Sequence, residues 1–359
     1  MKIKKIILIL CALCLCLGSF YGCGRKDEAD VHVFYYTYSD TYISTVRTAL
    51  DKELSDAGIS FQDHDSNNNQ TTQTEQVQTA ITKGAKMIVV NIVTTGSDDA
   101  ANGIVKLAKD AGIPVIFFNR EVSDSVVNSY DKCAYIGTDA AEAGYLQGDM
   151  IGDYVVKNYN AIDLNGDGKI SYVMFMGEKG NNEAIYRTRY SVENANKKLK
   201  AAGKPELVFY DKANSDQYLL DRDGKWSAQA ANEYMTTILA SYNTQNKNMV
   251  ELVICNNDGM AEGAVSALSA AGFNTGAANA TAIPVFGVDA TSAAVSLIGA
   301  GKMAGTIKQD SEGMAKAISK TVANALGDKD ILEGMDDYQK DEDSDKIRIH
   351  YAVYLGEEK

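Results

Sequence analysis

Residues 163–171 read DLNGDGKIS, a spacing typical of the calcium-binding loop of an EF-hand. Loop positions 1, 3 and 5 carry oxygen-bearing side chains, those of Asp163, Asn165 and Asp167. Gly168 stands where the backbone must turn sharply, and Lys169 can offer its carbonyl at the next position. The twelfth position, which should carry a bidentate carboxylate, is Met174. The spacing therefore predicts either a calcium site whose last ligand comes from a distant part of the chain, or an Asx-rich turn without a metal.

Motifs for catalysis are missing from the sequence. The three histidines have no metal-ligand spacing, and no GxSxG elbow, P-loop or GxGxxG motif occurs. Glu183 and Asp289 could imitate the paired acids of a glycosidase, but the sequence does not set the distance between their carboxyl groups. We therefore expect a protein that is not an enzyme.

The N-terminus resembles a bacterial lipoprotein signal. Three lysines precede an apolar run at 6–17, which is too short for a bilayer span of about 20 residues. Gly22 precedes Cys23, as in the lipobox whose cysteine is lipidated after cleavage. We expect residues 1–22 to be a signal peptide and residues 23–30 a lipidated tether, with ordinary cleavage or an uncleaved anchor as the alternatives. The protein would then be held at the outer face of the cell membrane.

Charge and cysteine usage narrow the partners. A formal net charge of −13 disfavours nucleic acid and anionic lipid, and it suits a neutral ligand. Beyond the signal and Cys23, two cysteines remain, Cys133 and Cys255, which are too few for a disulfide framework. We expect two buried thiols, and a single bridge between them stays open.

Short apolar segments alternate with segments of helical spacing. The apolar runs are rich in Val, Ile and Phe, and they stand at 31–36, 87–93, 114–119, 172–176, 207–211, 251–257 and 284–289. Helical spacing occurs between them, at 42–57, 72–84, 97–111, 140–157 and 183–202. This alternation predicts an α/β fold with parallel sheets covered on both faces, and the length of the chain suggests two domains. The acidic segment 327–346 is expected to be a solvated surface excursion.

Polar or aromatic residues follow several of the apolar runs directly. They are Asp40, Tyr42, Asn119, Asn257, Asp258 and Asp289. Asparagine and aspartate often cap the next helix, which explains any one of them. Ligands of open α/β sheets bind just beyond the carboxyl ends of the strands, however, and amides and carboxylates suit a ligand rich in hydroxyl groups.

Seven segments of the chain resemble the galactose/glucose-binding proteins of bacterial sugar transporters. They are YTYSDTYISTVRTAL, PVIFFNREV, SYDKCAYIGTD, DLNGDGKIS, ICNNDGMAEGAV, PVFGVDA and MAGTIKQD. The likeness runs in register over essentially the whole chain after the signal segment. It implies two doubly wound parallel-sheet lobes of the type I periplasmic binding protein fold. The implied lobes are 31–138 plus 310–346 and 139–309 plus 347–359, joined by three crossings near 137–140, 308–311 and 347–352.

The resemblance also implies which residues contact the ligand. Its polar contacts fall on Asp40, Asn119, Glu183, Arg187, Asn257 and Asp289. Tyr42 and Trp226 match the two aromatic side chains that sandwich the sugar ring, whose apolar C–H faces pack on such rings. The pocket departs from the family pattern at three positions, where Asn181 replaces a histidine, Glu183 an aspartate and Gln309 an asparagine. These changes leave the identity of the sugar open.

For the calcium loop, the resemblance implies that a distant glutamate completes the site, and Glu251 is the matching residue. The ligands would be Asp163, Asn165, Asp167, the Lys169 carbonyl, Ser171 and Glu251. Such a set is a normal oxygen shell for calcium. The ion would tie a loop to a strand as a structural clamp.

The expected function is capture of a monosaccharide, glucose or galactose first, by hinge closure of the two lobes. The closed monomer would then deliver the sugar to an ABC permease. The alternative is a sensor subunit that presents the liganded form to a chemoreceptor or sensor kinase.

Overall fold

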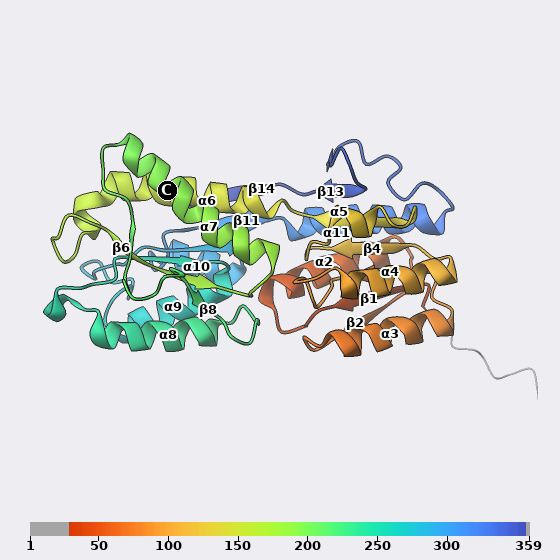
Figure 1. Ribbon diagram of the computed structural model, residues 1–359, viewed down its shortest axis with the longest axis horizontal. Coiled ribbons are helices and arrows are strands. Elements are labelled where there is room, and N and C mark those ends of the chain that lie inside the picture. Colours follow the sequence, from red (N-terminus) through yellow and green to blue (C-terminus); the bar gives the residue numbers. More distant parts are fainter. Residues whose placement is uncertain (1–28, 357–359) are drawn as a thin grey trace, which may run out of the picture.

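A computed structural model describes residues 29–356 and shows two lobes side by side, each built around its own sheet (Figure 1). The expected signal peptide and Cys23 lie outside the described residues. Among residues 29–356, no helix combines the length and apolarity that a membrane span requires.

The first lobe contains a seven-stranded sheet in the order β12-β13-β5-β4-β3-β1-β2. Its strands are β1 (Val31–Tyr35), β2 (Phe61–Asp65), β3 (Met87–Val90), β4 (Val115–Phe118), β5 (Cys133–Gly137), β12 (Gln339–Lys340) and β13 (Lys346–Arg348). Its helices are α2 (Thr41–Asp56), α3 (Gln70–Lys83), α4 (Asp99–Ala111), α5 (Asp124–Val127) and α11 (Ser311–Leu326). Helices α2 and α11 pack on one face and α3 and α4 on the other, so that the central strands are buried on both sides.

The second lobe repeats this architecture. Its sheet has the order β14-β11-β10-β9-β6-β7, and β8 pairs with β6 beyond this path. The strands are β6 (Ser171–Met176), β7 (Val208–Phe209), β8 (Leu219–Leu220), β9 (Leu252–Cys255), β10 (Val285–Asp289), β11 (Gly305–Gln309) and β14 (Tyr351–Tyr354). The helices are α6 (Ala140–Ile162), α7 (Asn182–Ala201), α8 (Ala228–Ser241), α9 (Asp258–Ala270), α10 (Ser292–Gly299) and the 3-10 turn η1 (Thr244–Asn246). Helices α6 and α7 cover one face, and α8 and α9 cover the other.

Three crossings join the lobes, between β5 and α6, between β11 and α11, and between β13 and β14. The expected α/β architecture with two parallel-dominated sheets is therefore confirmed. The expected boundary after residue 346 needs a correction, because Ile347 and Arg348 pair with Ile136 and Gly137 of β5 and so belong to the first sheet.

The sequence pattern missed several short strands. Strand β2 reads FQDHD, which lacks an apolar run because this strand lies at the edge of its sheet and is only partly buried. Strand β11 reads GTIKQ, and its apolar content is a single isoleucine. Short strands of this kind are recognised by their pairing partners rather than by their own composition.

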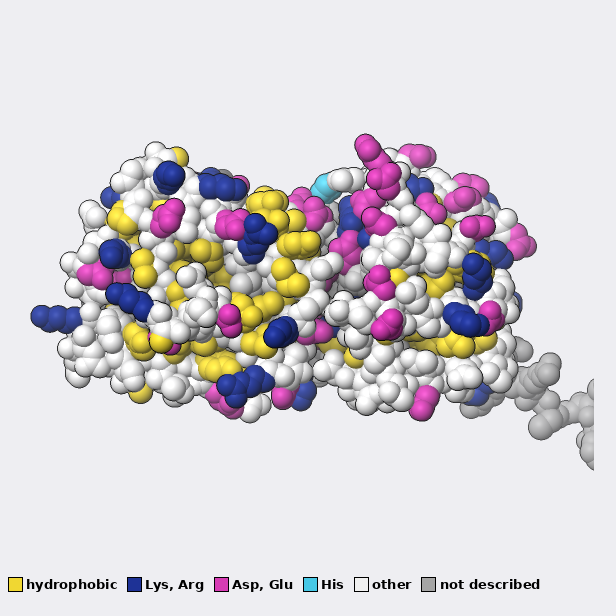
Figure 2. All heavy atoms as spheres, in the orientation of Figure 1, with side chains coloured by type: hydrophobic (Ala, Val, Ile, Leu, Met, Phe, Trp, Pro, Cys, Tyr) yellow, Lys and Arg dark blue, Asp and Glu magenta, His cyan; other side chains and the backbone are white. Residues whose placement is uncertain are grey.

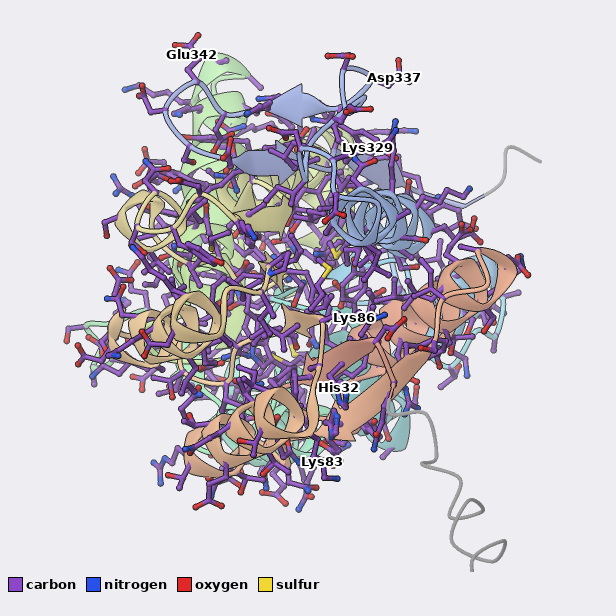
Figure 3. The ribbon with its side chains drawn as sticks, turned by 90° about the vertical axis from the view of Figure 1, so that its right-hand side faces the viewer. His32, Lys83, Lys86, Lys329, Asp337 and Glu342 are labelled. Atoms are coloured by element: carbon purple, nitrogen blue, oxygen red, sulfur yellow. The ribbon has the colours of Figure 1, made fainter. Side chains whose placement is uncertain are left out.

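The two cysteines within residues 29–356 are buried, unpaired and in different lobes, Cys133 in β5 and Cys255 in β9, as expected of structural thiols. The acidic segment near the C-terminus forms part of the first-lobe surface, where acidic side chains gather in Figure 2. Asp337 and Glu342 project into solvent (Figure 3), but Ile331 and Met335 of the same segment are buried in the lobe core. The segment is therefore solvated on one side and anchored on the other.

Candidate functional site

A cavity of about 40 Å³ lies between the two lobes, at the carboxyl ends of the strands. All ten residues that the sequence predicts as ligand contacts line it, namely Asp40, Tyr42, Asn119, Asn181, Glu183, Arg187, Trp226, Asn257, Asp289 and Gln309. The cavity is smaller than the roughly 300 Å³ or more typical of small-molecule sites. The lobes must therefore move apart before a ligand of that size can enter or leave.

Three of the lining residues also cap helices. Asp40 accepts a hydrogen bond from the Ile43 amide at the start of α2, and Asn181 and Asn257 cap α7 and α9 in the same way. Capping and lining the cavity are thus compatible, because the helices begin at the strand ends where the cavity lies. Asp258 behaves differently: its carboxylate is held by Thr291 and Thr306, and it does not line the cavity.

Three lining residues have backbone conformations that L-amino acids rarely adopt. The φ angle is 59° at Asn119, 55° at Trp226 and 125° at Asp289. Such conformations cost about 1–3 kcal/mol each and concentrate at functional sites, where the surrounding fold enforces them. All three residues line the cavity, so these unfavourable backbone conformations occur at the candidate site.

Arg187 organises the second-lobe side of the cavity. Its guanidinium donates to the Asn256 carbonyl at 2.9 Å, to the Gln309 side-chain oxygen at 3.2 Å and to the Tyr351 hydroxyl at 2.9 Å. These contacts come from β11, β14 and the end of β9, so the position of Arg187 depends on three strands of the second sheet. Its Nε atom is left without a partner among the described residues.

Burial shapes the charges around Arg187. Desolvation raises the pKa of Glu183 and of Asp289, while the nearby guanidinium opposes both shifts. Burial also works against the charge of Arg187 itself, but Tyr351, Asp289 and Glu183 outweigh it and raise the pKa of the guanidinium. The site therefore combines a fixed cation with carboxyl groups that hydroxyl-rich ligands can meet as acceptors.

Several buried polar atoms of the lining residues find no hydrogen-bond partner within residues 29–356. They are the Tyr42 hydroxyl, both carboxyl oxygens of Glu183, the Nε atoms of Arg187 and Arg120, and the Gln309 amide nitrogen. Leaving such atoms unpaired costs about 1–3 kcal/mol each, which a ligand that pairs with them would recover. The set contains both donors and acceptors.

The cavity is also lined by three residues that the sequence did not predict as contacts: Tyr36, Ile43 and Arg120. Tyr36 donates to the Asp40 carboxylate at 2.6 Å, and the Arg120 guanidinium lies 4.3 Å from the centre of the Tyr36 ring. Arg120 directly follows Asn119 at the end of β4, so its place after a strand was an available signal.

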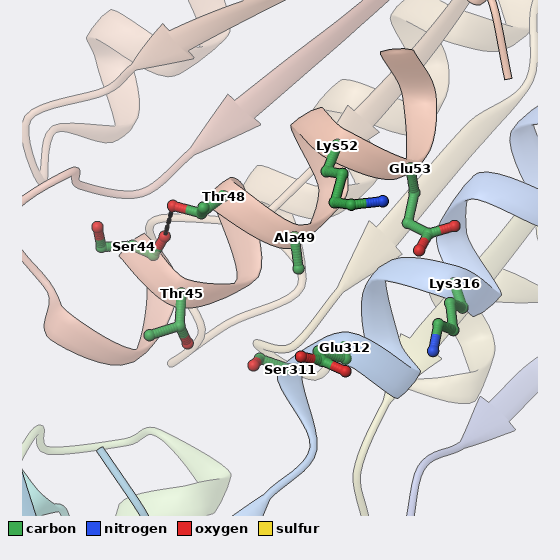
Figure 4. Close-up of a pocket in the computed structure, with 9 residues that line it drawn as sticks. All are labelled: Ser44, Thr45, Thr48, Ala49, Lys52, Glu53, Ser311, Glu312 and Lys316. Carbon is green, nitrogen blue, oxygen red and sulfur yellow. Dashed lines mark hydrogen bonds between the residues drawn. The ribbon is translucent and has the colours of Figure 1, made fainter. Parts of the chain in front are cut away.

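A larger hollow of about 640 Å³ lies between α2 and α11 (Figure 4). It holds none of the expected contacts, and Thr45, Thr48, Lys52, Glu312 and Lys316 around it are solvent-exposed. The smaller cavity between the lobes is therefore the better candidate site.

The loop 163–171 does meet Glu251, as the family resemblance implies. The Glu251 carboxylate accepts from the backbone amides of Leu164 at 2.7 Å, Asn165 at 3.1 Å and Ser171 at 3.0 Å. Burial raises the pKa of Glu251, and these three amides oppose the shift. Glu251 thus ties the loop to the start of β9 by its own hydrogen bonds.

The other expected metal ligands are turned toward the loop backbone. Asp163 accepts from three amides, those of Gly166, Asp167 and Gly168, while Asn165 and Asp167 each accept from the amide two residues on. The part of the chain that the structure describes contains no group of three or more His, Cys, Asp or Glu side chains placed to share a metal ion. The oxygen-only donor set of Asp163, Asn165, Asp167, Ser171, Glu251 and the Lys169 carbonyl suits calcium. The metal site stays a prediction.

Comparison with known proteins agrees with the fold. The profile of the family described as "Periplasmic binding protein domain" matches residues 31–330. The chain is 34% identical over 357 residues to the D-galactose/methyl-galactoside binding periplasmic protein MglB of Haemophilus influenzae, covering 99% of this chain and 97% of that protein.

Solved structures share the architecture. One is an ABC transporter solute binding protein of Clostridium phytofermentans with bound β-D-glucose, with a TM-score of 0.68, 22% identity and coverage of 90% of this chain and 93% of that one. Another, from Bacillus halodurans with bound myo-inositol, has a TM-score of 0.66, 24% identity and coverage of 92% and 96%. At these identities the likeness shows the fold alone. With the family profile and the full-length relative, the matches lead to one conclusion: the chain belongs to the periplasmic binding protein family.

Proposed function

We propose that the protein is an extracytoplasmic receptor that captures a monosaccharide between its lobes and delivers it to an ABC permease. Glucose and galactose are the first candidates. The observation that carries the proposal is the cavity between the lobes, where buried, unpaired donors and acceptors of Tyr42, Glu183, Arg187 and Gln309 surround one space.

The chemistry of this cavity suits a sugar ring. A pyranose has a rim of hydroxyl groups, each of which both donates and accepts, and this matches a mixed set of unpaired atoms. Its C–H faces pack on aromatic rings, and Tyr42 and Trp226 stand in the lining from different lobes. A ligand held in this way would join the lobes and favour closure.

The relatives support the same ligand class. The Haemophilus influenzae relative is described as binding D-galactose and methyl-galactoside, and the two solved structures contain β-D-glucose and myo-inositol. All are small cyclic polyols. None of these names an enzyme, in line with the missing catalytic motifs. A lipid on Cys23, which would hold the receptor at the membrane, is part of this proposal.

The identity of the sugar depends on Asn181, Glu183 and Gln309. Trp226 is the single tryptophan of the sequence and lines the cavity, so its emission reports binding directly. The purified protein should be titrated with glucose, galactose, xylose and ribose. A saturable change at micromolar sugar is the expected result, and the order of affinities identifies the ligand. A flat trace for all four sugars, from protein with an intact melting transition, would refute the proposal.

A further inference from the structure

An ion pair spans the two lobes beside the cavity. Arg120 follows β4 of the first lobe, and Glu178 follows β6 of the second. The guanidinium nitrogen lies 2.6 Å from the carboxylate oxygen. Only 4% of the Arg120 side chain and 20% of the Glu178 side chain are exposed, so the pair is largely removed from water.

The first lobe holds the guanidinium in a fixed position. It donates to the Val93 carbonyl at 2.8 Å, and it lies 4.3 Å from the centre of the Tyr36 ring. Both groups come from the ends of neighbouring strands of the first sheet. Because arginine is a rigid planar donor, it can bridge these groups and a carboxylate at once.

On the other lobe, the carboxylate connects directly to the aromatic wall of the cavity. The oxygen of Glu178 that pairs with Arg120 also lies 3.4 Å from the indole nitrogen of Trp226. The indole is therefore linked through one carboxylate to the opposite lobe. Two neutral contacts between the lobes, from Asn68 to the Asp223 carbonyl and from Asn181 to Thr95, are longer, at 3.5 Å each.

Each charge belongs to one lobe, so the pair exists only while the lobes are together. When they separate, water can solvate both groups, and neither is left buried alone. Removal of one partner strands the other charge in the closed form, which is costly in a buried environment. Loss of the pair should thus penalise closure without penalising the folding of either lobe.

We propose that Arg120 and Glu178 form a latch that holds the lobes closed around a bound ligand and fixes the Trp226 indole against it. The latch sets how long the ligand stays bound. This inference rests on the proposed capture of a monosaccharide. It adds Glu178 as a positioning residue, which does not line the cavity and acts through Arg120 and Trp226, which do.

The test compares Arg120→Gln, Glu178→Gln and the double variant with the wild-type protein. Glu193→Gln is the matched control, because Glu193 forms an exposed ion pair with Arg189 at 2.8 Å in the same lobe. The Glu193 side chain is 45% exposed and that of Arg189 is 60% exposed. Calorimetry gives Kd for glucose or galactose, whichever the wild type binds more tightly. Stopped-flow emission gives the rates, and ligand-free melting checks that each variant folds.

Each single variant should raise the dissociation rate at least about ten-fold, a factor that mutations of buried charge pairs commonly reach. The association rate should change less than three-fold, and the emission maximum of Trp226 in the complex should shift. The loss of affinity in the double variant should be smaller than the product of the two single-variant losses. The reason is that the double variant leaves neither charge without a partner in the closed form.

The latch would be refuted if the single variants released the sugar at the same rate as Glu193→Gln. It would also be refuted if the affinity losses simply multiplied in the double variant. In both cases the proposed capture of a monosaccharide would stand. Failure of the wild-type protein to bind any monosaccharide would overturn the proposed function and the latch with it.

Discussion

Gly177 and Trp226 are in direct contact. A Cβ atom added to Gly177 would lie 2.1 Å from Cδ2 of the Trp226 ring. Since real Cβ contacts are never that short, the indole can occupy this place only beside a glycine. Gly177 directly follows β6, and its amide donates to the Asn256 side chain, so the backbone there has little freedom to yield.

Gly177→Ala should therefore displace the indole from the cavity. We expect the affinity for the sugar to fall by about two- to ten-fold, because aromatic stacking contributes about 0.5–1.5 kcal/mol beyond the area it buries. Fluorescence titration measures the change. The control is Gly103→Ala in α4, where an added Cβ meets no atom within 4 Å. Equal affinity of both variants would show that the indole does not contact the ligand.

Glu183→Gln should weaken binding without unfolding the protein. Both carboxyl oxygens are buried and unpaired within residues 29–356, and they face the cavity that Arg187 also lines. Hydrogen bonds to charged groups contribute about 1.5–3 kcal/mol, which corresponds to a loss of roughly ten- to one-hundred-fold in affinity. Calorimetric titration measures it, with exposed Glu193→Gln on the same helix as the control. An unchanged Kd would place Glu183 outside the ligand contacts.

The carboxyl groups of Asp51 on α2 and Asp63 on β2 form a pair remote from the site. Burial, together with the neighbouring Asp51, raises the pKa of Asp63 to about 8, and burial raises the pKa of Asp51 as well. The folded state thus holds a proton that the unfolded chain loses near pH 4. This contribution to stability is complete below pH 4 and is lost as the pH rises through about 8.

We therefore expect the melting temperature to fall by roughly 2–4 °C between pH 6 and pH 9, the shift typical of about 1 kcal/mol in a large domain. Asp63→Asn cannot lose this proton, so its melting temperature should change less over the same interval. Calorimetric scans across this pH range make the comparison. An identical pH dependence in the variant would assign the effect to other groups.

Glu251→Ala should destabilise the second lobe whether or not a metal is present. The variant leaves the amides of Leu164, Asn165 and Ser171 without their acceptor. Each stranded donor costs about 1–3 kcal/mol where it remains buried, so the melting temperature in chelator should fall by several degrees. An unchanged melting temperature in chelator would mean that the loop does not depend on this carboxylate.

Calcium binding is tested separately. If the loop binds calcium as the sequence predicts, saturating calcium should raise the wild-type melting temperature. Calcium at one hundred times its Kd would add about 2.7 kcal/mol to the free energy of unfolding. Asp167→Ala should abolish that rise while changing the metal-free protein little, because Asp167 accepts only from the Lys169 amide within its own loop. Equal wild-type melting in calcium and in chelator would identify the segment as a metal-free Asx-rich turn.

The sequence by itself determined the fold class and part of the cavity lining, while Asn181, Glu183, Arg187, Trp226 and Gln309 were implied by the family resemblance. Apolar runs separated by helical segments require covered parallel sheets, and in such sheets the carboxyl ends of the strands meet at one edge. Asn119, Asn257 and Asp289 could be placed there because each follows a buried run. The edge strand β2 could not be predicted from the sequence, since its polar residues show no pattern of burial.

Only the tertiary structure decided how the two lobes meet. Arg120 and Glu178 are 58 residues apart, and no periodicity relates them, because their contact depends on how two separately packed lobes approach each other. The same holds for the loop carboxylates of Asp163 and Asp167, whose spacing predicts a metal site and whose hydrogen bonds with the loop backbone only the folded structure shows. Local sequence sets which groups are available, whereas long-range packing sets which of them face each other. The Arg120–Glu178 contact and the surroundings of the loop carboxylates both depend on this packing.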